Sequence, residues 1–178
     1  MPSLTRKALA KLGIVPVVNT TGGRVVAKAV EYHLSAPIRS QEARTVRVGY
    51  AFDGNGRSLI LTLPEPPSSN RYWRYAIVRK RPVVLLSAEA RAYRKAVREG
   101  TEPCIPWDHF PLMGPVAITL TWYRGRKSGD LDNRIKQVLD ALKGIAYGDD
   151  AQVAHIWALR KDDKGNARVE VQVTEFAP

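Results

Sequence analysis

The sequence has a single cysteine, few acidic residues and no long apolar run. Because Cys104 has no partner within the 178 residues, an internal disulfide is excluded, and no set of Cys and His residues has zinc-ligand spacing. No window approaches the ~18 consecutive apolar residues of a membrane helix, and the first residues lack the apolar core of a signal peptide. We therefore expect a soluble protein of the reducing cytoplasm with no membrane partner.

Basic residues outnumber acidic ones. There are 28 Lys and Arg against 17 Asp and Glu, which gives a formal net charge of +11. An excess of this size favours a polyanionic partner such as nucleic acid, because Lys and Arg neutralise phosphates and release counterions. Residues 130–150 reverse the trend with five acids and three bases. Like charges repel one another, so a divalent cation is the common functional reason for such a local cluster.

The apolar pattern predicts one α+β domain over residues 45–178, preceded by an extension of uncertain order over residues 1–44 that contains a short helix at 3–12. A β-hairpin is expected over 45–63, because alternating apolar residues flank the turn sequence Asp-Gly-Asn-Gly. The remaining expected elements are a proline-rich loop at 64–70, a strand at 83–86, a helix at 87–98, a loop at 101–115, strands at 116–123, 153–159 and 168–174, and a helix at 131–143. We expect two main helices on one mixed β-sheet, with the apolar strand 153–159 in a central position.

Two acidic residues, Asp130 and Asp132, lie at the junction between a predicted strand and a predicted helix. One interpretation is structural, because Asp132 is placed to cap the helix and Lys136 lies four residues from both Asp132 and Asp140. Such exposed ion pairs contribute only about 0.3–0.5 kcal/mol each. The other interpretation is that these carboxylates bind a metal ion.

A second acidic pair, Asp149 and Asp150, closes the connection from Gly144 to the next strand. An extended six-residue segment reaches about 20 Å, so this pair is able to return along the helix to the first pair. Three carboxylates from two loops would suit Mg²⁺, which prefers oxygen ligands and keeps several waters. A bound Mg²⁺ would activate water for attack on a phosphodiester.

Four segments of this sequence together resemble the RusA family of Holliday junction resolvases. The residues that carry the likeness are Gly129-Asp130-Leu131-Asp132-Asn133-Arg134-Ile135-Lys136 with Asp140, the run Asp149-Asp150-Ala151-Gln152, and the upstream segments 63–74 and 87–94. The resemblance covers about residues 58–178. It implies a Mg²⁺-dependent homodimer of phage or prophage origin that nicks paired strands of a four-way DNA junction in a bacterial or phage-infected cell.

The resemblance also implies roles for individual residues. Asp130, Asp132 and Asp150 match the family's essential carboxylates, with Asp149 as the alternate to Asp150, and Lys136 matches its essential lysine. From the basic sequence around these positions we expect DNA contacts from five residues: Arg71, Arg74, Arg124, Arg126 and Lys127. Two alternatives stay open at this stage: a branched-DNA-binding protein without cleavage activity, and a nuclease acting on flaps, forks or RNA.

Overall fold

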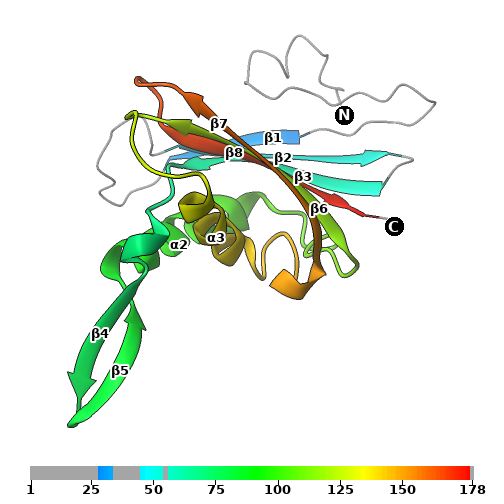
Figure 1. Ribbon diagram of the computed structural model, residues 1–178. Helices are drawn as coiled ribbons and strands as arrows, with labels where there is room; N and C mark the ends of the chain where they lie inside the picture. The colour runs from blue at the N-terminus through cyan, green and yellow to red at the C-terminus, as the bar shows by residue number, and fades with distance from the viewer. Residues whose placement is uncertain (1–27, 34–44, 54–55, 177–178) are drawn as a thin grey trace.

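A computed structural model describes residues 28–33, 45–53 and 56–176. In this part of the chain a six-stranded mixed sheet has the order β1-β2-β3-β8-β6-β7, and helices α2 and α3 pack on one face of it (Figure 1). The elements are β1 (Lys28–His33), β2 (Thr45–Asp53), β3 (Gly56–Pro64), η2 (Ser69–Arg71), β4 (Trp73–Val78), β5 (Arg81–Leu86), α2 (Ala88–Thr101), η3 (Glu102–Cys104), β6 (Val116–Arg124), α3 (Asp132–Leu142), η4 (Asp150–Gln152), β7 (Val153–Asp162) and β8 (Arg168–Glu175). The predicted α+β class with two main helices is confirmed. No helix of the described chain is long and apolar enough to span a membrane.

The predicted hairpin over 45–63 is confirmed as the antiparallel pair β2–β3, whose register ends at Asp53 opposite Gly56. Gly56 has φ +117°, which glycine adopts without strain. Strand β1 lies within the predicted extension and pairs antiparallel with β2. The predicted helix at 3–12 lies outside the described residues, and a domain boundary near residue 44 stays a prediction.

The core lies between the sheet and the two helices. Strand β6 has the predicted alternation, because Val116, Ile118, Leu120 and Trp122 are fully buried. Strand β8 buries its three valines, and the apolar side of α3 buries Val138, Ala141 and Leu142. The apolar face of the strands, which repeats every 2 residues, therefore packs against the apolar side of α3, which repeats every 3.6 residues.

Strand β7 is an edge strand, so the prediction that it is central is wrong. It follows β6 through the crossover helix α3 and pairs with β6 in parallel, as a βαβ unit requires. Its apolar residues remain partly open, with exposed fractions of 40% for Ile156, 58% for Trp157 and 42% for Leu159. An apolar run in the sequence is compatible with a buried strand and equally with an exposed surface that binds a partner.

Helix α2 begins at the predicted Ser87, whose side chain accepts a hydrogen bond from the Ala90 backbone nitrogen at 3.1 Å. The helix continues past Gly100, its predicted end, to Thr101. A Cβ added to Gly100 would lie 2.6 Å from Val46 Cγ2, so the glycine allows α2 to approach β2 closely. This contact fixes α2 against the sheet.

Strands β4 and β5 form a separate two-stranded sheet that stands away from the main sheet (Figure 1). The strand predicted at 83–86 is part of β5, whereas β4 was not predicted from the sequence. Register pairs Trp73 with Leu86 at the base and Val78 with Arg81 at the tip.

Candidate active site

Asp130 and Asp132 lie where the chain passes from β6 into α3. Helix α3 begins at Asp132, but its N-cap is Leu131 and no side chain makes a capping hydrogen bond. The interpretation of Asp132 as the helix cap is therefore wrong. Both carboxylates belong to exposed residues, and neither has a hydrogen bond or ion pair within the described chain. They are free to bind a cation.

Gly129 sets the path of the chain into the acidic pair. Its φ is +93°, a left-handed conformation that favours glycine. A Cβ at this position would lie 3.1 Å from Arg134 Nη2 and 3.3 Å from Trp122 Cη2. Glycine thus lets the loop turn tightly against the start of α3 and leaves Asp130 at the surface.

Lys136 is positioned by a charged network and not by Asp132. Its Nζ lies 3.4 Å from Asp140 Oδ1, and Arg94 Nη2 lies 3.0 Å from Asp140 Oδ2. The Tyr72 hydroxyl donates a hydrogen bond to the same carboxylate and accepts one from Arg94. Burial, with Asp140 as the second cause, raises the pKa of Tyr72 to about 12. The network anchors Asp140 beneath Lys136, whose exposed ammonium group remains available to a ligand.

Asp149 and Asp150 share one cation. Lys143 Nζ lies 2.5 Å from Asp149 Oδ2 and 3.0 Å from Asp150 Oδ1. The Lys143 hydrogen bond is the main reason that the pKa of each carboxyl is lowered. Asp149 also caps η4 in a capping box with Gln152. The second acidic pair thus already has a cation within the protein, which offsets one of its two negative charges.

The structure does not bring the two acidic pairs together. Lys143 directly follows α3, about 16 Å along the helix axis from Asp132 at ~1.5 Å per residue. Since Asp149 and Asp150 bind Lys143, the connection folds at the C-terminal end of α3 instead of returning to its start.

The described residues contain no group of three or more His, Cys, Asp or Glu side chains placed to hold a metal ion. Asp130 and Asp132 nevertheless have the chemistry that Mg²⁺ requires. Mg²⁺ is commonly held by one or two carboxylates together with waters and substrate phosphates, and these two carboxylates have no competing cation. Asp150, in contrast, has Lys143 as a competitor.

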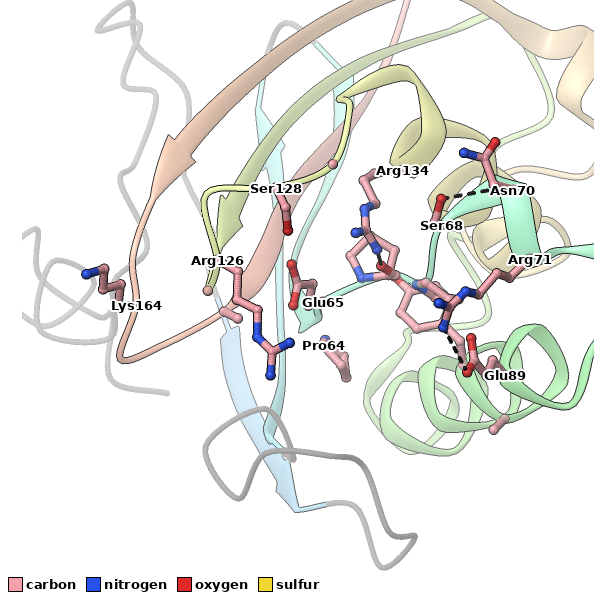
Figure 2. Close-up of a pocket in the computed structure, with 17 residues that line it drawn as sticks. Pro64, Glu65, Ser68, Asn70, Arg71, Glu89, Arg126, Ser128, Arg134 and Lys164 are labelled. Atoms are coloured by element: carbon pink, nitrogen blue, oxygen red, sulfur yellow. Dashed lines mark hydrogen bonds and ion pairs between the residues drawn. The ribbon is translucent and has the colours of Figure 1, made fainter.

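A pocket of about 800 Å³ opens between the proline-rich loop, α2 and the loop before α3 (Figure 2). Its lining includes Gly129 and Arg134, which flank the acidic pair in the chain. Four of its six charged lining residues are cationic; the six are Arg71, Arg126, Arg134, Lys164, Glu65 and Glu89. Glu65 accepts a hydrogen bond from Trp122 Nε1 at 3.0 Å, and Arg71 lies 3.9 Å from Glu89. The excess of positive charge suits a phosphate group.

Arg134 forms a fixed wall of this pocket. Its guanidinium lies 4.7 Å from the centre of the Trp122 ring and donates a hydrogen bond to the Pro66 carbonyl. Burial lowers its pKa, and within the described chain its Nε has no hydrogen-bond partner. Arg134 therefore joins the proline-rich loop to the first turn of α3 and holds the pocket next to Asp130.

The five predicted DNA-contact residues have different surroundings. Arg71, Arg74, Arg126 and Lys127 are exposed. Arg124 instead forms an ion pair with Asp162, and its side chain is 15% exposed. The structure thus leaves four of the five cations open to solvent.

Sequence reasoning missed Arg94 and Lys143, which control the surroundings of Lys136 and Asp150. Arg94 is 22 residues from Tyr72, which in turn is 68 residues from Asp140, so no local spacing indicates the network. From the sequence, Lys143 is only one of the three bases among residues 130–150.

Comparison with known proteins supports the assignment from motifs. Residues 64–174 match the family model described as endodeoxyribonuclease RusA. The chain is 34% identical over 118 residues to proteins named crossover junction endodeoxyribonuclease RusA in Escherichia coli (strain K12), Shigella sonnei (strain Ss046) and Enterobacteria phage 82. Each alignment covers 65% of this chain and 93% of the relative. This chain belongs to the RusA family and is an endodeoxyribonuclease.

Proposed function

We propose that this endonuclease resolves four-way DNA junctions by paired nicking in recombination and repair, with Mg²⁺ as its cofactor and as a homodimer. The observation that carries the proposal is the pair of carboxylates without ionic partners, Asp130 and Asp132, beside a pocket with a cationic wall. The cationic wall attracts a DNA phosphate, but Asp130 and Asp132 would repel it. A metal ion between these carboxylates and the phosphate would remove the repulsion. The names of the relatives indicate a junction as the substrate.

In this proposal Asp130 and Asp132 hold the metal. A part for Asp150, or for Asp149 as its alternate, requires the connection after α3 to leave Lys143 and move toward the start of the helix. A bound Mg²⁺ lowers the pKa of a water ligand and neutralises charge that develops on the phosphate. Lys136 places its ammonium group toward the scissile phosphate and stabilises the additional negative charge of the transition state. Asp140 acts as a positioning residue, because it holds Lys136 from below.

The exposed cations guide the DNA backbone to the acidic pair. Arg126 lines the pocket on the side of Ser128, and Arg71 lies on the opposite wall (Figure 2). These side chains would contact phosphates without reading the base sequence. Selection of a junction then depends on the shape of the DNA.

A homodimer has a physical reason, because a four-way junction has approximate two-fold symmetry and a C2 pair places two active sites on equivalent strands. A phage or prophage origin is consistent with the relative from Enterobacteria phage 82. Both points are part of the proposal.

The deciding assay compares cleavage of a synthetic four-way junction, a matched duplex and a flap, each with Mg²⁺ and with EDTA. We expect paired nicks in the junction with Mg²⁺ and no cleavage with EDTA. Equal cleavage of duplex and junction would refute junction resolution. Binding without cleavage would favour a branched-DNA-binding protein, and preference for the flap would favour a flap nuclease.

The variant Asp132→Asn tests the metal assignment. It removes one anionic ligand but keeps the size of the side chain, so cleavage should be lost while junction binding is kept or tightened through reduced repulsion of phosphate. Binding is measured by fluorescence anisotropy in EDTA. Cleavage at the wild-type rate would show that Asp132 is not a metal ligand.

A further inference from the structure

The β4–β5 hairpin exposes one face that is wholly apolar. Residues directly opposite in an antiparallel pair share a face, and alternate pairs along the ribbon lie on the same side. The pairs on this face are Trp73 with Leu86, Tyr75 with Val84, and Ile77 with Pro82. Tyr75 is 84% exposed and Ile77 is 80% exposed. A two-stranded ribbon is marginally stable alone, so an uncovered apolar face of this kind indicates a binding surface.

The tip of the hairpin carries cations in a strained conformation. Arg79 and Lys80 form the two-residue turn between Val78 and Arg81, with φ of +50° and +63°. Two positive φ values define a type I′ turn, which strongly favours Asn-Gly. Non-glycine residues in the left-handed region cost of the order of 1 kcal/mol, and such strain is concentrated at functional sites. The turn therefore has two positive charges at its tip in place of the less strained Asn-Gly pair.

The charge of the hairpin has one sign. Residues 73–86 contain four cations and no acid. The four are Arg74, Arg79, Lys80 and Arg81, and none of them has an ionic partner in the described part of the chain. This charge complements a polyanion, whereas packing against the same hairpin of a second copy would bring like charges together.

The hairpin is rooted beside the acidic pair. The Ser69 hydroxyl donates a hydrogen bond of 2.9 Å to the carbonyl of Asn133, the residue after Asp132. The base is closed by the Ser87 backbone nitrogen, which donates to the Tyr72 carbonyl at 2.7 Å. Tyr72 is buried, but the adjacent Trp73 is 53% exposed. Strands of six residues extend about 20 Å at ~3.3 Å per residue, the length of about six base steps.

From these observations we infer that the β4–β5 hairpin is a DNA-binding arm that enters the branch point of the junction. The tip cations Arg79 and Lys80 contact phosphates, and the apolar face with Tyr75 and Ile77 packs against bases that are unstacked where the strands exchange. A two-stranded ribbon fits a DNA groove, and apolar side chains inserted at base steps stabilise distorted DNA. This inference rests on the proposed function, since it assigns the part of the chain that recognises the branch.

The charge test uses the double variant R79N/K80G. Asn-Gly is the preferred type I′ pair, so the variant removes both tip cations while the turn is favoured. In the matched control K95N/R98N two cations are removed from α2, where each is already paired with a glutamate. Anisotropy titrations of a four-way junction in EDTA at several salt concentrations compare the variants. Each lost phosphate contact lowers the salt slope by about 0.9, so R79N/K80G should lower it by about 1.8 for each protomer whose arm binds the junction and weaken binding more than tenfold at ~0.1 M salt. If R79N/K80G has the same junction affinity and salt slope as K95N/R98N, the hairpin is not a DNA-binding arm.

The apolar test uses Ile77→Ser with a junction that carries the fluorescent base 2-aminopurine at the branch point. Wild type should raise the fluorescence by unstacking this base, and I77S should lose most of the increase. Sedimentation of both proteins is measured in parallel. If I77S dissociates a dimer while the 2-aminopurine response is unchanged, the face binds a second copy and the DNA assignment is wrong.

Failure of the proposed function is separable from failure of the arm. If wild type does not cut junctions with Mg²⁺ but R79N/K80G weakens junction binding, junction resolution is refuted and the DNA-binding arm is supported. Wild type that cuts junctions while R79N/K80G matches the control contradicts only the arm. Absence of DNA binding by wild type overturns both.

Discussion

Tyr72→Phe provides a direct test of the network beneath Lys136. The substitution removes only the hydroxyl, which donates to Asp140 and accepts from Arg94. A hydrogen bond to a charged group contributes about 1.5–3 kcal/mol. Because Tyr72 is 2% exposed, water cannot replace the lost hydroxyl freely. We expect the free energy of unfolding at neutral pH to fall by about 2 kcal/mol, which lowers the Tm by about 4–8 °C for a chain of this size.

The pH dependence gives the same network a second signature. The pKa of Tyr72 is raised from 10.0 to about 12 in the folded protein, so the neutral phenol is stabilised by folding. This stabilisation is complete below pH 10 and is lost as the pH rises toward 12. From neutral pH to pH 11, wild type should lose about 1.4 kcal/mol more than Tyr72→Phe, because each unit of pKa shift corresponds to ~1.36 kcal/mol.

The assay is urea unfolding followed by tryptophan fluorescence at a series of pH values for both proteins. The difference between wild type and Tyr72→Phe should be largest at neutral pH and should shrink as the pH approaches 11. Equal stability at neutral pH, together with a difference that does not change up to pH 11, would refute the buried Tyr72–Asp140 bond.

Three further predictions concern the variants Lys143→Met and Gly100→Ala. In Lys143→Met, the pKa values of Asp149 and Asp150 should rise toward ordinary values, as measured by NMR titration of the carboxyl carbons; unchanged values would show that the ion pairs are absent in solution. The same variant should need less Mg²⁺ for half-maximal cleavage if Asp150 is a ligand, because no cation competes for it; an increased requirement would contradict that role. Gly100→Ala should destabilise the protein by about 1–3 kcal/mol in thermal unfolding, since its Cβ would lie 2.6 Å from Val46 Cγ2; an unchanged Tm would contradict the close packing of α2 on β2.

The fold was predictable where local patterns and tertiary packing agree. The segment 131–143 has a helical apolar period and ends at Gly144, and the structure has α3 over Asp132–Leu142. Strand β6 alternates over its whole length and is buried on that alternation. In both elements the spacing of the apolar residues also identifies the side that contacts the core, so the packing could be predicted from the sequence.

The sequence was ambiguous where apolar residues remain exposed. Strand β7 and the β4–β5 hairpin both contain runs typical of buried strands, yet Trp157 and Tyr75 are largely open to solvent. A single sequence does not distinguish an apolar run that faces the core of its own chain from one that faces a ligand. The same ambiguity led to the wrong central position for β7 and to the missed strand β4.

The acidic cluster shows how the structure refines a conclusion from composition. Of the five aspartates in residues 130–150, Asp140 is paired with Arg94 and Lys136, and the two that precede β7 share Lys143. Asp130 and Asp132 keep no ionic partner within the described chain, although their protein carries a net charge of +11. Surface cations in such excess could have been placed beside this pair, as they are beside the other three acids. Two carboxylates left unpaired beside a cationic pocket therefore support an external cation as their partner, which is the role proposed for Mg²⁺.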